Sequence, residues 1–501
     1  MIGGIHLDGK KEATLISWAI RRSHPPAKVY IPLLQCEGQD TMPCVQPGAR
    51  VRVGEKIAEP QSPSSVALHA SVSGEVTAIG PFPHPLLGES QAIEIHSDGR
   101  DEKISVIGLE RPGWNQLSPE EIGLILQDLG VVELSDGMAP VHSGRYPGQA
   151  RGIWSSTCPG LQAPGGWRPE GSSLDTPLAK PHHARTHTLI LNGCESEPYL
   201  TSDQVLMMSH PLEILKGAEI LRRFFAADRV IIALEDNKRE VAELLKSKIY
   251  FLKWKHVEVK TVPSLYPQEA AIPLTRQLLQ TDLASLFLNR GAGACVFNVA
   301  TAFAAYEAVV LQKPLYERVV TVGGECVVEP KNLWVRLGTS FEDALKTCRG
   351  LLREPQKVLM NGPMKGIAQE SLRVPVMKAT RAVLALPKEI TSQEEVQPCI
   401  RCGLCVEACP VEISPAMITL AAEKDLFDLA GKWGAEFCIE CGNCSYVCPA
   451  KRPMIELIHH ARCYLDGHNK TLSPMGDFKK SQTVMFENLQ KKKRGMAEIN
   501  T

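Results

Sequence analysis

Apolar and polar residues alternate in two segments of the first hundred residues, in the second half of 45–57 and along 66–76. Alternation places every second side chain on the same face of the chain, so each segment is predicted to contain a strand with one buried face. Glycines stand where hairpins can turn the chain back on itself. The first hundred residues are therefore predicted to be β-rich with many turns.

The spacing of apolar residues changes to that of a helix after Leu117. Ser118, Pro119 and Glu121 form a capped helix start, because a serine and a glutamate three positions later can satisfy each other's backbone amides. Apolar residues then recur every three or four positions as far as Leu129. We expect a helix here whose apolar face packs on a core.

Strands and helices are predicted to alternate between residues 188 and 259. The elements, in order, are the strand 188–191, the helix 211–225, the strand 230–234, the helix 238–248 and the strand 257–259. This alternation predicts a parallel α/β sheet. Ligands of such sheets bind at the carboxyl ends of the strands. The first strand runs directly into a loop with Asn192, Glu195 and Glu197, which is either a binding site or a solvated acidic turn.

Residues 137–187 lack apolar periodicity and are rich in Gly, Pro, Ser and His. We expect a long surface insertion over this stretch. Its histidines, His182, His183 and His187, have no cysteine or acidic motif beside them. A solvated loop is therefore favoured over a metal site.

A smaller β-containing unit is predicted farther along the chain. Apolar strands are expected near 319–324 and 333–339, followed by a helix near 341–348. This unit is similar to the soluble-ligand-binding β-grasp modules. A further helix is predicted at 454–464.

Two runs of cysteines near the carboxyl end carry the most specific chemistry. The first run is Cys399, Cys402, Cys405 and Cys409, and the second is Cys438, Cys441, Cys444 and Cys448, each followed by a proline. This spacing is that of bacterial ferredoxins with [4Fe-4S] clusters, in which the fourth cysteine of each run ligates the other cluster. We predict two clusters with crossed ligand sets: Cys399, Cys402, Cys405 and Cys448 for cluster one, and Cys438, Cys441, Cys444 and Cys409 for cluster two.

Structural zinc is the alternative, since Cys-x2-Cys pairs also bind zinc. A zinc site normally takes four ligands from two separated pairs, and it does not require a third cysteine and a fourth one followed by proline. The spacing therefore favours iron-sulfur clusters. Two adjacent clusters with no other catalytic group between them form an electron relay.

Length and charge limit the class of protein. A chain of 501 residues is expected to hold several domains, because single cores rarely grow beyond about 250 to 300 residues. The net charge of -1 gives no argument for a nucleic-acid partner. The first residues lack a basic region followed by an apolar core, and no window reaches about 18 uninterrupted apolar residues, so we expect neither a signal peptide nor a membrane-spanning helix. We expect a cytoplasmic chain that reaches a membrane only through its partners.

Short motifs along the chain resemble those of the RnfC family, the C subunits of the Rnf complex, a membrane-bound, ion-translocating ferredoxin:NAD oxidoreductase. The matching segments are 3–6, 30–33, 69–74, 192–201, 298–302, 314–322, 362–364 and both cysteine runs. They span nearly the whole chain and follow the order of the family. The first hundred residues also resemble a biotinyl/lipoyl-type barrel-sandwich. Because Ser65 to Leu68 stand where a carrier lysine would be, a structural module is favoured over a swinging-arm carrier.

The resemblance implies a multidomain α/β and α+β fold. The expected parts are a barrel-sandwich-like β domain at 1–110, a parallel α/β domain similar to the complex I flavoprotein at 111–315, a β-grasp module at 316–390, a two-cluster ferredoxin-type helical domain at 391–465 and a tail at 466–501. The resemblance also implies FMN, hydride exchange with NAD(H) and one-electron transfer to the clusters. Asn192, Glu195 and Glu197 would then lie by the flavin and the nicotinamide.

The chain departs from the family in two segments that would hold the flavin. The segment 130–141 has Glu133 and Asp136 where family glycines let the backbone approach the flavin phosphate. The second segment has Glu269 in place of a glycine and Ala271 in place of an acid. Carboxylates repel a phosphate, so we predict that FMN and NAD(H) bind weakly or not at all.

The leading interpretation is an electron-transfer subunit of an Rnf-type membrane complex, peripheral on the cytoplasmic face of the membrane. Its expected partners are the other subunits of that complex and a ferredoxin-type or other redox protein. One alternative is a stand-alone soluble flavin and iron-sulfur reductase related to cobalamin reductase. The other is a non-redox scaffold that holds structural metal.

Overall fold

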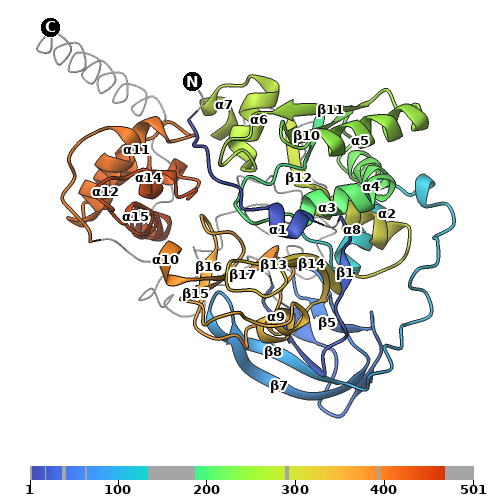
Figure 1. Ribbon diagram of the computed structural model, residues 1–501. Helices are drawn as coiled ribbons and strands as arrows, with labels where there is room; N and C mark the ends of the chain where they lie inside the picture. The colour runs from blue at the N-terminus through green and yellow to red at the C-terminus, as the bar shows by residue number, and fades with distance from the viewer. Residues whose placement is uncertain are drawn as a thin grey trace, which may run out of the picture. The chain divides into compact units, whose positions relative to one another are not determined.

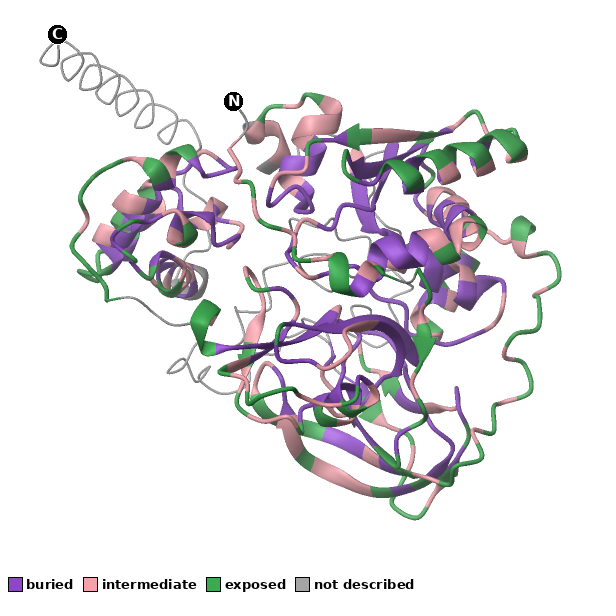
Figure 2. Ribbon diagram, viewed as in Figure 1, coloured by how far each residue is buried: buried purple, intermediate pink, exposed green. Residues whose placement is uncertain are grey.

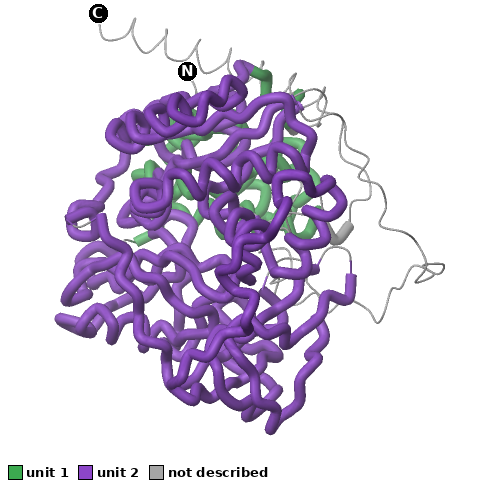
Figure 3. The backbone as a smooth tube through the Cα atoms, turned by 90° about the vertical axis from the view of Figure 1, so that its right-hand side faces the viewer, with its two compact units in different colours: residues 1–5, 281–291, 393–501 green, residues 6–280, 292–392 purple. Residues whose placement is uncertain are grey.

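A computed structural model describes residues 3–16, 18–35, 41–62, 65–133, 187–287, 293–391 and 395–468. The chain divides into two compact units (Figure 3). The larger unit comprises residues 6–280 and 292–392, and the smaller unit comprises residues 1–5, 281–291 and 393–501. The predicted insertion, with His182 and His183, lies outside the described residues, apart from His187.

The larger unit begins with two antiparallel sheets (Figure 1). The first has the order β2-β8-β7-β4, from Lys28–Pro32, Gly88–Ser97, Gly74–His84 and Arg50–Val51. The second has the order β3-β5-β6, from Thr41–Pro43, Lys56–Pro60 and Leu68–His69. Alternate apolar residues such as Ile57, Val76 and Ile95 are buried. The predicted β module is confirmed.

Helix α2 (Pro119–Asp128) starts as its sequence predicts. The Ser118 hydroxyl accepts a hydrogen bond from the Glu121 amide at 3.2 Å, and the Glu121 carboxylate accepts one from the Ser118 amide at 2.7 Å. Its apolar residues Ile122 and Leu126 are fully buried. The capping box and the core face are therefore both confirmed.

A parallel sheet of order β11-β10-β9-β12 occupies the middle of the larger unit. Its strands are Val257–Val262, Arg229–Glu235, Thr188–Asn192 and Ala294–Asn298. The helices along this part of the chain are α3 (Ser202–Ser209), α4 (Pro211–Phe224), α5 (Arg239–Leu252), α6 (Ala271–Leu279) and α8 (Val299–Val309). The three predicted strands, α4 and α5 are confirmed, whereas β12, α3, α6 and α8 were not predicted.

Strands β9 and β10 at the centre of the parallel sheet are buried on both faces (Figure 2), whereas the edge strand β11 is partly exposed. Leu189 and Leu191 of β9 belong to a core shared with α2, α4 and α8, while Ile190 between them packs with Leu274 of α6. The strand therefore sends alternate side chains to opposite layers of helices, as expected for a parallel α/β sheet. Its carboxyl end places Asn192 and the following loop at one edge.

A six-stranded mixed sheet completes the larger unit, with the order β1-β14-β13-β17-β15-β16. These strands are Arg21–Arg22, Lys331–Arg336, Glu317–Gly323, Ala382–Leu386, Lys357–Met360 and Ile367–Gln369. Helix α9 (Phe341–Thr347) follows β14, near the predicted position. The edge strand β1 comes from the start of the chain, and its two exposed arginines gave no strand pattern.

The smaller unit is helical in its described part. Its helices are α7 (Leu283–Phe287), α11 (Leu404–Glu407), α12 (Pro415–Ala422), α13 (Phe427–Lys432), α14 (Asn443–Tyr446) and α15 (Met454–His468). Ile418 and Ile458 are fully buried between α12 and α15. Among the described residues, no helix has the length and apolar character needed to cross a membrane.

Candidate functional site

Both cysteine runs in the smaller unit fold into a loop that leads into a short helix. Gly403 and Gly442 precede α11 and α14 with φ angles of 87° and 83°, a left-handed conformation that glycine adopts without strain. The third cysteine of each run, Cys405 or Cys444, lies within this helix, and the fourth, Cys409 or Cys448, follows its end. Six of the eight cysteines are buried, whereas Cys399 is half-buried and Cys402 is exposed.

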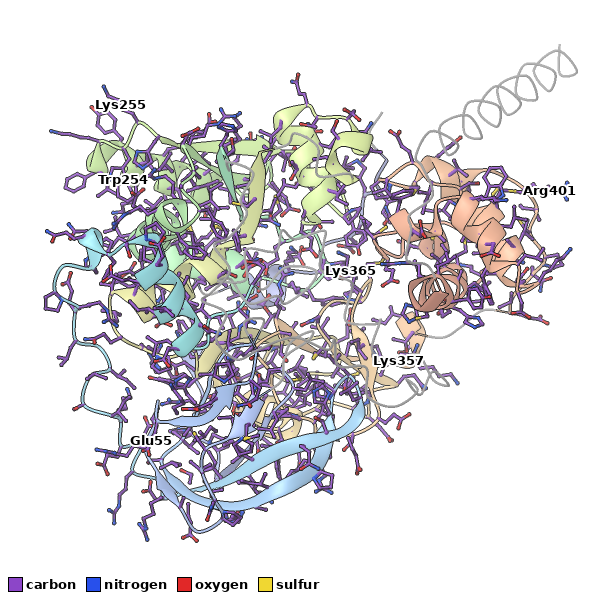
Figure 4. The ribbon with its side chains drawn as sticks, turned by 180° about the vertical axis from the view of Figure 1, so that it is seen from behind. Glu55, Trp254, Lys255, Lys357, Lys365 and Arg401 are labelled. Atoms are coloured by element: carbon purple, nitrogen blue, oxygen red, sulfur yellow. The ribbon has the colours of Figure 1, made fainter. Side chains whose placement is uncertain are left out.

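One pocket is lined by cysteines from both runs. Its walls include Cys399, Cys402, Cys405 and Cys448. Arg401, which also lines the pocket, marks this region in Figure 4. The pocket thus combines the first three cysteines of one run with the fourth cysteine of the other.

The remaining cysteines lie near one another at a second position. Burial raises the pKa of the Cys409 thiol, and the charges of Cys441 and Cys438 raise it further. Burial likewise raises the pKa of Cys444, with Cys438, Cys441 and Cys409 among the nearest thiols that add to the effect. The Glu440 amide also lies 3.3 Å from the Cys438 sulfur, a contact that would stabilise a thiolate.

These two groups of four thiols fit a pair of [4Fe-4S] clusters, which would supply one-electron carriers. Within the described residues, no three His, Cys, Asp or Glu side chains converge closely enough to hold a single metal ion. The thiolates of a [4Fe-4S] cluster bind four different irons, so such convergence is not required of them.

The acidic loop of the larger unit is buried, and its side chains bind the protein itself. The Asn192 amide nitrogen donates to the Glu269 carbonyl at 2.7 Å, and its oxygen accepts from the Cys194 amide at 3.0 Å. The Glu195 carboxylate accepts from the amides of Asp203 and Gln204 at 3.0 and 3.3 Å. Glu195 therefore caps the start of α3.

Glu197 contacts a turn of the mixed sheet. Its two carboxylate oxygens accept hydrogen bonds from the amides of Met364 and Lys365 at 3.0 and 3.1 Å, and Figure 4 labels Lys365. Burial raises the pKa of Glu197 to about 7, and the charge of Glu269 adds to the rise. The carboxylate thus joins the β9 loop to the segment between β15 and β16.

Glu133 and Glu269, the two glutamates that the family resemblance places at glycine positions, are buried as well. Glu133 accepts a hydrogen bond from the Asn298 amide at 3.0 Å. Glu269 accepts one from the Ser196 amide at 3.2 Å and lies 3.7 Å from a nitrogen of Arg381. Because both carboxylates are buried, already bound by the protein and of the same charge sign as a phosphate, Glu133 and Glu269 do not fit as ligands of a flavin phosphate.

Charged groups that the sequence pattern did not indicate complete this network. Glu235 ends β10 and accepts from the Glu195 amide, and Lys238 donates to Glu235. Lys11 donates to the Glu195 carbonyl, and Arg381 donates to Asp203 at 3.1 Å. The position of Glu235 could have been predicted from the sequence, because Glu235 ends a strand that runs parallel to β9 and so lies at the same edge of the sheet as Asn192. The positions of Lys11 and Arg381 could not have been predicted in this way, because both residues are far in sequence from the loop after β9.

Family models match four parts of the chain. They are the RnfC barrel sandwich hybrid domain at 1–100, the Nuo51 FMN-binding domain at 169–307, the SLBB domain at 319–368 and a 4Fe-4S dicluster domain at 391–449. The C subunit of the proton-translocating ferredoxin:NAD(+) oxidoreductase complex of Clostridium ljungdahlii is 35% identical over 85% of this chain and 85% of its own length. The chain belongs to the RnfC family.

Other relatives agree with this membership in the RnfC family. The C subunit of the Na(+)-translocating ferredoxin:NAD(+) oxidoreductase complex of Acetobacterium woodii is 31% identical over 92% of this chain and 96% of its own. The C subunit of the ion-translocating oxidoreductase complex of Rhodobacter capsulatus is 33% identical over 92% and 82%. Among solved structures, an air-oxidized NAD+-reducing [NiFe]-hydrogenase aligns with 72% of this chain and with 68% of the hydrogenase chain. The sequence identity is 13% and the TM-score is 0.45.

Proposed function

We propose that this chain is the electron-transfer subunit of an Rnf-type membrane complex that couples electron transfer between ferredoxin and NAD, or another carrier, to ion translocation. The eight cysteines of the two runs would hold two [4Fe-4S] clusters, which would supply one-electron carriers between donor and acceptor. The pocket that combines Cys399, Cys402 and Cys405 with Cys448 supports this proposal most directly. The named relatives, each the C subunit of its complex, favour it over a stand-alone reductase.

The ligand sets of the clusters are crossed between the runs. Cluster one takes Cys399, Cys402, Cys405 and Cys448, and cluster two takes Cys438, Cys441, Cys444 and Cys409. Their shared smaller unit keeps the clusters close together, as an electron relay requires. The exposed Cys402 makes cluster one the more accessible of the two to a redox partner.

The relay receives its electrons from a protein donor and not from a flavin of its own. The support is chemical, because buried Glu133 and Glu269 stand where the family has glycines. Asn192, Glu195 and Glu197 then act as structural residues that join elements of the larger unit. We also propose that the domain boundaries lie at about residues 110, 315, 390 and 465.

The partners are the other subunits of the complex and a ferredoxin-type or other redox protein. We place the chain on the cytoplasmic face as a peripheral subunit, held there by those partners. Washing membranes with high salt or a chaotrope should release it without detergent. Retention through such washes would contradict a peripheral attachment.

Anaerobic purification followed by iron and sulfide assays tests the relay. We expect about eight irons and about eight acid-labile sulfides per chain, since two complete four-cysteine sets are present. The visible spectrum should show the broad absorbance of iron-sulfur clusters and bleach on reduction. A colourless protein that contains zinc would overturn the proposal.

A further inference from the structure

We propose that the Glu133 carboxylate is a built-in anion that takes the place of a phosphate in the FMN-binding type of domain. The inference rests on the proposed absence of flavin and goes further, because it names the group that fills the phosphate position. Glu133 is 4% exposed, and one of its oxygens accepts a hydrogen bond from the Asn298 amide at 3.0 Å.

The place of this contact is one that binds anions in other proteins. Asn298 ends β12 and is the N-cap of α8 (Val299–Val309). The start of a helix presents free amides and a partial positive charge, and the carboxyl edge of a parallel sheet is where its ligands bind. The match to the FMN-binding domain extends over this helix start, whereas Glu133 comes from outside the matched range.

Both polar atoms of the Asn298 side chain are bound by this chain. Its side-chain oxygen accepts from the Ala300 amide at 2.7 Å, and its side-chain nitrogen donates to Asp203 at 2.8 Å. Asp203 in turn accepts from Arg381 at 3.1 Å. Together with Glu133, these groups of the protein occupy the backbone amide and the side-chain atoms of Asn298.

A buried guanidinium provides an independent sign of an anion position. Arg318 is 4% exposed, and its Nη1 atom has no hydrogen-bond partner among the described residues. The acidic groups that act on it are Asp203 and Glu133. A buried cation without full hydrogen bonding requires a nearby negative charge, and Glu133 supplies part of it. Removal of Glu133 would leave Arg318 with Asp203 as the acidic group acting on it and would leave the Asn298 amide without its carboxylate acceptor.

A carboxylate that replaces a ligand differs from an ordinary buried carboxylate in one measurable way. Once its side chain is shortened, the vacated position should accept a small soluble anion. The experiment compares wild type, Glu133→Ala and Glu133→Gln as full chains with reconstituted clusters under anaerobic conditions. Thermal unfolding of the larger unit is followed in inorganic phosphate, formate or chloride at equal ionic strength.

We expect Glu133→Ala to unfold at a lower temperature than wild type and to be partly restored by phosphate or formate. At ten times the dissociation constant, the midpoint should rise by about 3 °C relative to chloride. Wild type should not respond, because Glu133 occupies the position. Glu133→Gln should be destabilised but not restored, because its amide still fills the space without the charge.

Ile122→Ala serves as the matched control, since it removes a buried side chain of α2 without creating an anion position. It measures how far phosphate stabilises any weakened form of this protein. If Glu133→Ala gained no more than Ile122→Ala, Glu133 would be a purely structural residue and the inference would be wrong. An equal gain by wild type would show an open position and would also overturn it.

No flavin enters this experiment, so it can fail separately from the proposed function. A wild type that bound FMN tightly would contradict the proposed relay without flavin, whatever the anions do. Restoration of Glu133→Ala by phosphate would still identify the start of α8 as an anion position in that case.

Discussion

Cysteine spacing carried more information at the residue scale than any other feature of the sequence. The spacing within each run is local, and ferredoxin chemistry explains it without knowledge of the fold. The local sequence likewise indicated the carboxylates of the loop after β9, but it did not indicate the groups to which they are hydrogen-bonded. Glu197 binds amides 167 and 168 positions away. Local sequence therefore indicated which residues matter and not what they contact.

Double substitutions should reveal the crossed ligand sets. If Cys409 belongs to cluster two, Cys409→Ser combined with Cys441→Ser should damage one cluster only and leave about four irons per chain. Cys409→Ser combined with Cys402→Ser should damage both clusters and leave almost no iron. Iron and sulfide assays on anaerobic protein measure the difference. The reverse pattern would assign Cys409 to the cluster of its own run.

Stability should depend on pH through Glu197. Its pKa in the folded protein is about 7, raised from 4.5 by burial and by Glu269. A raised carboxyl pKa means that the folded state holds the proton more tightly, so the stabilisation is complete below pH 4.5 and is lost as the pH rises through 7. The loss between pH 5 and pH 8 should reach about 2.5 kcal/mol.

Glu197→Gln isolates this effect, because glutamine resembles the protonated acid and does not titrate. The difference in unfolding midpoint between wild type and Glu197→Gln should move against wild type as the pH increases from 5 to 8. Glu75→Gln, at an exposed position, is the control for surface charge. A difference that stays constant across this range would mean that Glu197 is ionised throughout.

At the scale of elements, the periodicity of apolar residues predicted the helices and strands that bury one face and expose the other. Helices α4 and α5 are amphipathic, and both were predicted. Helix α8 was not, because it is apolar on nearly every side, which removes the periodicity that marks a helix. Strand β1 consists of two exposed arginines held by pairing with β14. Only tertiary structure makes it a strand.

The turn between β15 and β16 depends on a close approach at Gly362. A Cβ atom there would lie 2.1 Å from a Glu197 carboxylate oxygen. Gly362→Ala should therefore displace Glu197 and break its hydrogen bonds to Met364 and Lys365, at a cost of about 2 kcal/mol or more. Denaturant unfolding measures the loss.

Gly80→Ala is the matched control for this substitution, because a Cβ atom there meets no atom within 4 Å. Its unfolding should stay within about 0.5 kcal/mol of wild type. Equal stability of the two alanine variants would show that the Glu197 carboxylate can move aside freely.

On the scale of the whole molecule, the order of motifs predicted the family and the sequence of folds. Barrel-sandwich, parallel α/β sheet, β-grasp module and cluster domain follow one another as expected. Order alone does not determine whether an inherited domain keeps its ligand. Retention of the ligand depends on a few side chains. Here the Glu133 carboxylate accepts a hydrogen bond from the amide of Asn298, which is 165 positions away in the sequence.

Because the fold alone does not determine whether FMN is bound, flavin binding has to be tested directly. The protein is reconstituted with FMN, separated from free flavin, and titrated with NADH under anaerobic conditions. We expect less than stoichiometric flavin and no rapid bleaching of the clusters by NADH, because carboxylates fill the positions of the family glycines. Dithionite should still bleach the clusters, which shows that they are intact. Tight stoichiometric FMN together with rapid NADH-dependent bleaching would instead give this chain the flavin chemistry that its family resemblance implies.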